Sequence, residues 1–233
     1  MSLNLLPTIK ESFQKYLNTN ARSNEKLKIL HARIAEDLSA SLGNGYVVES
    51  LGFGAGKERK INGRYIDKTV DITVSKTSGE IVGGIAVKFV MSNYSQNSNN
   101  YFENMLGETA NIRSANIPYF QILIIPEEIP YYDNKGIIKK AEHFSEHNIE
   151  KYLKLSEDNP SNLFHTPDKT LIFIISLPKL DIVKINNKSK YKKVYNNAGV
   201  DISHKIKTVF GKSVILNDYE DFINKIGHRI KAI

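Results

Sequence analysis

Two residues that could act together on a phosphate group, Asp71 and Lys88, lie on adjacent predicted strands. Apolar and polar residues alternate over 70–75, so Asp71 is predicted to face away from the core that the three apolar residues enter. The same alternation in the second strand places Lys88 opposite an apolar face. Residues 76–79 have the composition of a hairpin turn, so the two strands should pair antiparallel. An aspartate and a lysine can therefore meet across one hairpin.

An aspartate that holds Mg²⁺ beside a lysine suits the hydrolysis of a phosphodiester. The hard cation neutralises charge on the phosphate, and the ammonium group can orient or deprotonate the attacking water. A single carboxylate is a thin site for such an ion. At least one further acidic ligand is therefore expected at the same point.

Hydrophobic periodicity predicts the helices and strands that must position these residues. A helix is expected over residues 24–42, with apolar side chains at three- and four-residue spacing and Gly43 after it, and a shorter helix over 6–17. The strands are predicted over residues 46–51, 65–75, 80–90, 119–125 and 170–177, and the later helices over 101–114, 143–155 and 218–230. The glycine-rich basic stretch 52–64 reads as a loop or flap. The expected fold is mixed α/β, as a single domain over 1–233 with a core at 24–126 and a C-terminal elaboration at 127–233.

Composition narrows the classes of partner. The 233 residues carry a formal net charge of +7, and residues 179–212 contain nine lysines against Asp181 and Asp201. This charge favours an anionic partner such as a nucleic acid. Cysteine is absent, which excludes thiolate catalysis and cysteine-bound zinc and fits a reducing cytoplasm. No secretory signal or membrane-spanning run is recognised, so a cytoplasmic protein without membrane attachment is expected.

The order strand, strand, helix, strand, with Val70-Asp71 followed by Ala86-Val87-Lys88, resembles the PD-(D/E)XK nuclease superfamily over about residues 24–126. The resemblance implies a restriction-endonuclease-like central mixed β-sheet flanked by helices. It also implies catalysis by Asp71 and Lys88 with Mg²⁺. The chain departs from the family at Ala86, which stands where the second acidic residue belongs.

Some type II restriction endonucleases carry the missing carboxylate on the helix that follows the lysine strand, and this chain is similar to them. Glu108 is then the expected catalytic and metal-binding residue, because an apolar stripe beside it should turn it toward the sheet. Glu103 is the competing metal ligand on the same helix. Glu36 of the N-terminal helix is a further candidate metal ligand, since enzymes of this superfamily often aim a helical glutamate at the ion.

Other chemistries fit the sequence less well. The stretch Gly52 to Lys57 superficially resembles a phosphate loop, but the spacing is incomplete and Glu58 stands where a hydroxyl residue is needed, so no nucleotide cofactor is expected. Among the six histidines only His143 and His147 stand at the HxxxH spacing, and the other four are scattered, which disfavours a histidine-bound zinc cluster.

Two segments are candidate DNA-binding surfaces. The polar stretch 92–100 could read bases in the major groove, because amides and hydroxyls bond to base edges, although an ordinary loop that caps a helix would have the same composition. The basic residues of 52–64 could bind phosphates, although solvation alone would also explain them. The candidate contacts are Ser92, Asn93, Tyr94, Gln96, Asn97, Lys57, Arg59, Lys60 and Arg64.

These inferences predict a type II restriction endonuclease that cuts double-stranded DNA with Mg²⁺. A homodimer is expected, because two symmetric sites cut both strands of a palindrome. Two rivals remain: a non-catalytic DNA-binding protein that keeps the nuclease fold, and a repair or junction-resolving nuclease of the same superfamily.

Overall fold

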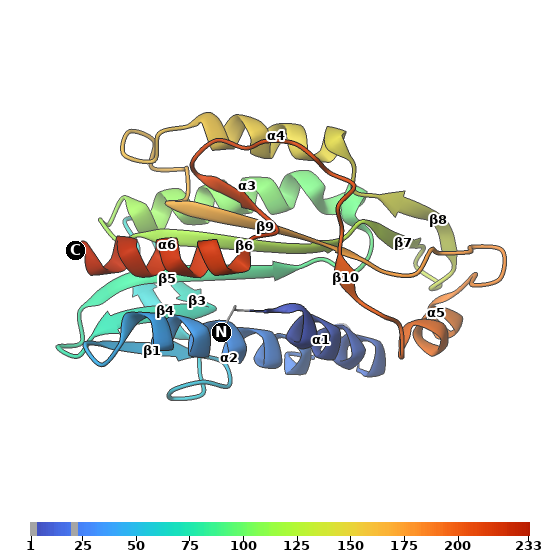
Figure 1. The fold of residues 1–233 in the computed structure, drawn as a ribbon, viewed down its shortest axis with the longest axis horizontal. Helices are drawn as coiled ribbons and strands as arrows, with labels where there is room; N and C mark the ends of the chain where they lie inside the picture. The colour runs from blue at the N-terminus through green and yellow to red at the C-terminus, as the bar shows by residue number, and fades with distance from the viewer. Residues whose placement is uncertain (1–3, 20–22) are drawn as a thin grey trace.

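The computed structural model describes residues 4–19 and 23–233, and it places a seven-stranded mixed sheet between two layers of helices (Figure 1). The helices are α1 (Leu6–Asn18), α2 (Glu25–Leu42), α3 (Tyr94–Arg113), α4 (Glu146–Glu157), α5 (Lys188–Tyr195) and α6 (Tyr219–Lys231). The strands are β1 (Tyr46–Ser50), β2 (Arg59–Asn62), β3 (Asp67–Val70), β4 (Ile72–Lys76), β5 (Ile81–Phe89), β6 (Tyr119–Pro126), β7 (Glu128–Tyr132), β8 (Ile138–His143), β9 (Lys169–Ser176), β10 (Asp201–Ile202) and β11 (Val214–Leu216). The predicted mixed α/β class is confirmed.

The main sheet has the order β1-β4-β5-β6-β9-β10, with β11 also paired to β9. Strands β1, β4 and β5 are antiparallel, whereas β5, β6 and β9 run parallel. Parallel neighbours need long crossovers, and α3 and α4 lie in the two connections that join β5 to β6 and β6 to β9. The sheet therefore takes strands from both halves of the chain.

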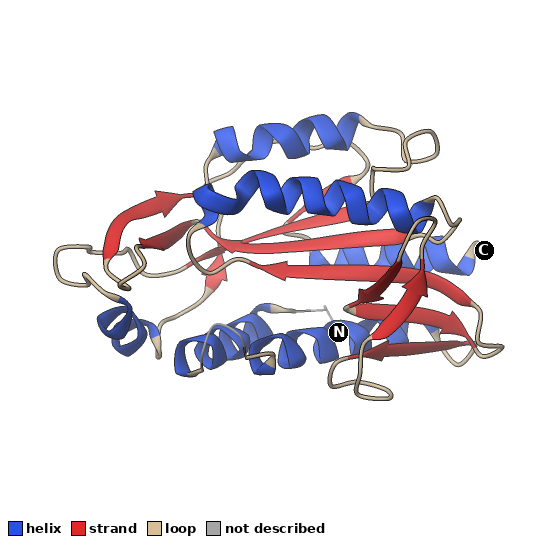
Figure 2. Cartoon of the chain, turned by 180° about the vertical axis from the view of Figure 1, so that it is seen from behind, coloured by secondary structure: helices blue, strands red, loops and turns tan. Residues whose placement is uncertain are grey.

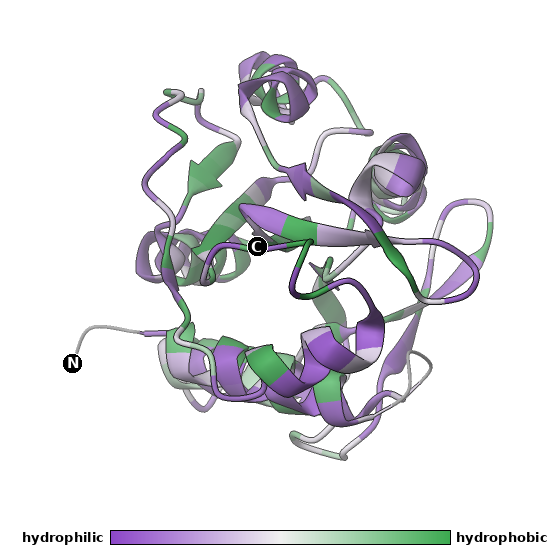
Figure 3. Cartoon of the chain, turned by 90° about the vertical axis from the view of Figure 1, so that its right-hand side faces the viewer, coloured by the Kyte–Doolittle hydropathy of each residue, from purple (hydrophilic) through white to green (hydrophobic). Residues whose placement is uncertain are grey.

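The helices bury the sheet on both faces. Figures 1 and 2 show α3 and α4 on one side, and α1, α2 and α6 on the other. Every residue of β6 is buried, and the apolar residues of β6 and β9 belong in alternation to two core clusters, one under each helix layer. Figure 3 shows the mixture of hydrophobic and hydrophilic positions on the covering helices. Strands buried on both faces read as continuous apolar runs, which explains why periodicity located them.

The strand predicted over 65–75 is interrupted at Asp71. Residues before the break pair with β2 in a separate two-stranded sheet, and residues after it pair with β1 and β5. The prediction that all three apolar residues of 70–75 enter one core is wrong for Val70. It packs with Ile61 and Tyr119 beneath the hairpin, whereas Ile72 belongs to the main core.

The β2–β3 hairpin also corrects two expectations about its surroundings. Residues 59–62 form β2, so the predicted loop 52–64 is a loop only at 52–58 and 63–64. Thr73 and Ser75, predicted to face away from the core, are 0% and 2% exposed. Arg59 donates from Nη1 to the Ser75 hydroxyl at 2.8 Å, so this face of β4 is covered by protein.

The polar segment 92–100 belongs to helix α3, which begins seven residues earlier than the predicted start at 101. Asn93 precedes the helix with φ of 52° and exchanges two hydrogen bonds with the backbone of Tyr132. Tyr94 is 3% exposed, and its ring lies 5.3 Å from that of Phe144. These tertiary contacts hold the first turns in place, although their composition alone favours a loop.

In the second half, β9, α4 and α6 confirm the predicted strand and helices. The β7–β8 hairpin, α5, β10 and β11 were not predicted. No helix in residues 4–19 and 23–233 is long and apolar enough to cross a membrane.

Candidate functional site

A cleft of about 650 Å³ lies on the α3 side of the sheet, and Asp71, Lys88 and Glu108 all line it. Asp71 comes from the break between β3 and β4, Lys88 from β5 and Glu108 from α3. Residues 24, 26 and 27 around the start of α2 also border the cleft. The structure thus brings together the three residues that were predicted to be catalytic.

Asp71 is held by the neighbouring strand. The register of β4 and β5 pairs Ile72 with Ile85, so its continuation places Asp71 opposite Ala86. Asp71 Oδ2 accepts a hydrogen bond from the backbone N–H of Val87 at 2.7 Å. Burial raises the pKa of Asp71 to about 6 against the lowering effect of this bond; the negative charge of Glu108 also raises it, and Lys68 and Lys88 lower it. The effect of burial on the pKa of Asp71 therefore outweighs that of the two nearby lysines.

Lys88 is exposed at the cleft, on the strand face that the alternation predicted. Its Nζ lies 4.5 Å from the centroid of the Tyr101 ring, which attracts a cation through the negative face of the ring. Within residues 4–19 and 23–233 no carboxylate forms an ion pair with Lys88. The ammonium group is therefore available to an anion in the cleft.

The structure distinguishes the three glutamates that were candidates for the missing metal ligand, because they differ in whether they line the cleft. Glu108 faces the cleft, but its Oε1 lies 2.5 Å from Nζ of Lys68. Glu103 is exposed on α3 and is not among the residues that line the cleft. Glu36 is exposed on α2 and also lies outside it. Only Glu108 of the three is placed to share a cation with Asp71.

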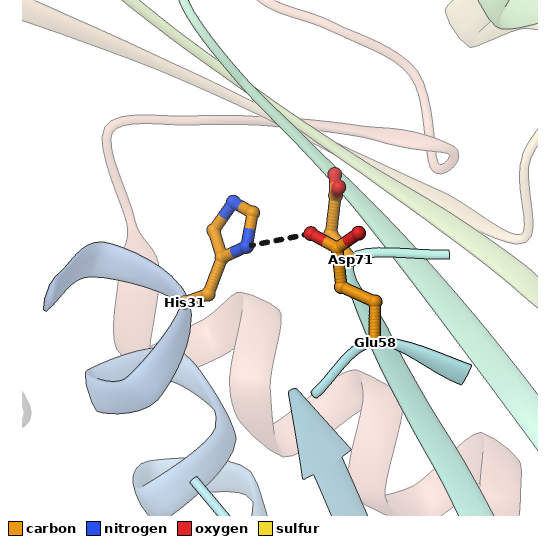
Figure 4. A group of neighbouring side chains, drawn as sticks. All are labelled: His31, Glu58 and Asp71. Carbon is orange, nitrogen blue, oxygen red and sulfur yellow. Dashed lines mark ion pairs between the residues drawn. The ribbon is translucent and has the colours of Figure 1, made fainter. Parts of the chain in front are cut away.

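Two residues that sequence reasoning did not select stand beside Asp71. Figure 4 shows His31 of α2 and Glu58 of the loop before β2 pointing toward it. One potential ligand atom from each of the three residues lies within 4.8 Å of the other two. The three residues come from separate segments, so no spacing motif could reveal them.

The His31 imidazole is completely buried, and neither ring nitrogen has a hydrogen-bond partner. Its Nδ1 lies 3.9 Å from Oε1 of Glu58, beyond hydrogen-bond distance. Burial lowers the pKa of His31 to about 4 although Glu58 raises it, so the ring is neutral at pH 7. Burial, followed by the charge of Asp71, raises the pKa of Glu58.

The floor of the cleft carries polar side chains that were also not predicted. The strand register places Ala86 beside Gln121 and Gln121 beside Thr170, in one row across β5, β6 and β9. The Nε2 atom of Gln121 and the Oγ1 atom of Thr170 are buried without hydrogen-bond partners, and both residues line the cleft. Buried polar atoms of native proteins rarely lack a partner, so this row has donors and acceptors available for a polar ligand.

The candidate DNA contacts divide into free and engaged side chains. Lys57, Lys60 and Arg64 are exposed in and around the β2–β3 hairpin. Arg59 is only partly exposed and bonds to Glu49 at 3.1 Å in addition to Ser75. The hairpin borders the cleft through residues 68 and 69, so its exposed cations lie on an element adjacent to the candidate catalytic residues.

Several residues of 92–97, which were predicted to contact DNA bases, make contacts within the protein. The Asn93 amide fixes the β7 backbone, and the Tyr94 ring is part of the core. The Asn97 amide donates to the carbonyl of Asn93 at 3.3 Å. Ser92 hydrogen-bonds to Tyr16, and Gln96 is exposed. The Tyr94 ring is therefore packed into the core, and its contact with DNA stays a prediction.

No protein family, curated protein or solved structure matches this chain. The functional argument consequently rests on the geometry of the cleft.

Proposed function

We propose that this protein is a Mg²⁺-dependent endonuclease that hydrolyses phosphodiester bonds in double-stranded DNA at a specific sequence, as a type II restriction endonuclease does. The observation that carries the proposal is the convergence of Asp71, Lys88 and Glu108 on one cleft from three elements. An acidic pair beside an unpaired lysine matches the needs of phosphodiester hydrolysis.

The donor set fits a magnesium ion. Mg²⁺ prefers oxygen ligands, and Asp71 and Glu108 supply carboxylates. Their mutual repulsion contributes to the raised pKa of Asp71, and one lysine at Glu108 offsets only part of the negative charge. Bound there, the ion would neutralise charge on a phosphate and make a water molecule more acidic.

The side chains of the chain itself have separate tasks in this proposal. The Val87 N–H fixes the orientation of the Asp71 carboxylate, which faces the cleft. Lys88 is free to bind the phosphate and orient the attacking water, while the Tyr101 ring restricts the position of its ammonium group. Gln121 and Thr170 on the floor can donate to or accept from the bound nucleotide.

A duplex DNA substrate is supported by charge. The net charge of +7 and the exposed cations of the β2–β3 hairpin favour binding to a phosphate backbone. Cutting both strands of a palindromic site requires two copies of this cleft, so the proposal includes a homodimer.

The test is digestion of a long unmethylated plasmid with Mg²⁺ or with a chelator. Discrete fragments that require Mg²⁺ are expected, and Asp71→Asn and Lys88→Ala should each slow cleavage by at least about a hundredfold, the scale of a lost acid–base or electrostatic group. Glu11→Gln, an exposed change on α1, is the matched control and should leave the fragments unchanged.

Three results would contradict the proposal. DNA binding without cleavage, unaffected by Mg²⁺ or by Asp71→Asn, would make the protein a non-catalytic DNA-binding protein. Cleavage of branched DNA but not of linear duplex would make it a junction-resolving nuclease. Cleavage retained by Asp71→Asn would place the active site elsewhere.

A further inference from the structure

We propose that His31, Glu58 and Asp71 form a binding site for a divalent transition-metal ion. This inference rests on the proposed function for its role, because the second ligand set shares Asp71 with the cleft. The binding itself can be measured without DNA or catalysis. It gives a role to His31 and Glu58, which are not among the proposed Mg²⁺ ligands.

The state of His31 is the first observation. A buried histidine of the core normally bonds through at least one ring nitrogen, because burying a polar group without a hydrogen-bond partner destabilises the fold. His31 is 0% exposed and has no partner at either nitrogen. The ring points toward Glu58 and Asp71, as Figure 4 shows. A metal ion would supply the partner that the protein does not.

The charge balance is the second observation. Asp71 forms no ion pair in residues 4–19 and 23–233, and the only pairing of Glu58 within these residues is with His31. Within these residues, neither carboxylate therefore has a lysine or an arginine at ion-pair distance. Buried charges are normally paired or coordinate a metal. Two carboxylates without a paired cation favour a dication.

The loop that carries Glu58 is shaped to fit against α2. Gly52 has φ of +89°, and a Cβ atom there would lie 2.8 Å from Cγ of Lys28 and 3.3 Å from the Cβ of Ala32. Gly54 has φ of +62°, and a Cβ atom there would lie 2.6 Å from the carbonyl oxygen of Val48. The close approach that these glycines permit brings the loop onto the helix turn that bears His31. Glu58 is thus positioned by packing of its loop.

The ligand types decide the class of metal. Mg²⁺ prefers a shell of oxygen atoms, whereas imidazole suits transition-metal ions. One imidazole and two carboxylates therefore favour Mn²⁺ or Zn²⁺ over Mg²⁺. The pair Asp71 and Glu108 lacks an imidazole, so the two ligand sets that share Asp71 differ in the metal they select.

The test is titration of the metal-free protein with MnCl₂. Binding is measured by calorimetry and by the loss of the electron paramagnetic resonance signal of free Mn²⁺. Wild type should bind Mn²⁺ more tightly than Mg²⁺. His31→Gln and Glu58→Gln should each weaken Mn²⁺ binding by more than about tenfold, the lower end of what loss of even an outer-shell partner costs. Glu108→Gln should leave this Mn²⁺ binding within about twofold of wild type.

Glu58 lies in a loop and is partly exposed, so Glu58→Gln tests the site even where a change at buried His31 impairs folding. Loss of Mn²⁺ binding in Glu108→Gln, with full binding in Glu58→Gln, would overturn the inference. Equal affinity of wild type for Mn²⁺ and Mg²⁺ would also overturn it. Neither result depends on DNA cleavage, which the plasmid assay measures separately.

Discussion

Two aspartates beside the main sheet, the buried Asp168 and the partly buried Asp71, have different electrostatic surroundings. Asp168, just before β9, receives Nε of Arg113 and Nε of Arg229 at 2.9 Å each. It also accepts the backbone N–H of Tyr119 at 3.1 Å. Asp71 has one backbone hydrogen bond, and the carboxylates of Glu58 and Glu108 are close enough to shift pKa values in this group.

The difference separates a structural carboxylate from one available for chemistry. At Asp168 two guanidinium groups offset the cost of burying the charge, and Arg113 additionally bonds the carbonyls of residues 160, 163 and 166. At Asp71 the cost of burial is not offset within the protein, and the pKa of the carboxyl is raised. An uncompensated buried carboxylate binds a cation more favourably than one that already has two cationic partners.

The largest expected effect on stability is at Asp168, whose charge is compensated by two arginines. Asp168→Asn should lower the free energy of unfolding by about 3–5 kcal/mol, because it leaves the nine-tenths buried Arg113 guanidinium without its counter-ion. Urea denaturation measures the change, with the exposed Asp181→Asn as control. A loss below about 1 kcal/mol would mean that Asp168 is not the anchor of this region.

The ionised Asp71 carboxylate should destabilise the metal-free protein, whereas the ionised Asp168 carboxylate stabilises it. The pKa of Asp71 is 3.8 when unperturbed and about 6 in the fold, so the folded state retains a proton that the unfolded chain releases between about pH 4 and pH 6. Stability therefore falls as pH rises through this window, by at most about 3 kcal/mol from this group. The cost is absent below pH 4 and fully present above pH 6.

Asp71→Asn removes this cost and should stabilise the metal-free protein at pH 7.5 by up to the same amount. Chemical denaturation in the presence of a chelator, at pH values from 4 to 7.5, measures the difference between wild type and variant. Taking this difference separates Asp71 from the other titrating groups. A variant that is less stable than wild type at pH 7.5 would contradict the raised pKa.

Sequence patterns located the elements whose burial is regular. Periodicity predicted α2, β5, β6 and β9, and alternation placed Lys88 on the correct face of β5. The break at Asp71 was missed, because it depends on β3 leaving the main sheet to pair with β2. The start of α3 was missed, because the bonds between Asn93 and Tyr132 are tertiary.

The candidate site was predictable where it lies on the β4–β5 hairpin and on α3. Asp71 and Lys88 follow from strand pairing, and Glu108 from a helical stripe combined with a family resemblance. His31 and Glu58 meet Asp71 through the path of a glycine-containing loop over α2, which has no signature in residue spacing. Local rules therefore gave half of the candidate ligands, and packing decided the others.

The smallest expected effect concerns Lys68, the lysine that forms an ion pair with Glu108. Its ion pair with Glu108 is partly exposed, so Lys68→Gln should cost less than about 1 kcal/mol of stability. Because Lys68 lowers the pKa of Asp71, its removal should raise that pKa further. The same loss of positive charge should tighten Mg²⁺ binding by about two- to fivefold, the equivalent of a partly screened charge.

Calorimetric titration with MgCl₂ distinguishes two roles for Lys68. Tighter binding in Lys68→Gln would show that the lysine competes with the cation for Glu108, so that Glu108 becomes available only when the pair opens. Weaker binding would show that Lys68 holds Glu108 in position for the metal, and the shielding argument would be wrong. Lys60→Gln is the matched control, because Lys60 is exposed on β2 and its nearest carboxylate, Asp67, lies 4.0 Å away. The sign of the Lys68 effect therefore decides between two roles of this lysine. It either shields the Asp71–Glu108 pair from a cation, as two arginines shield Asp168, or holds Glu108 in position for the metal ion.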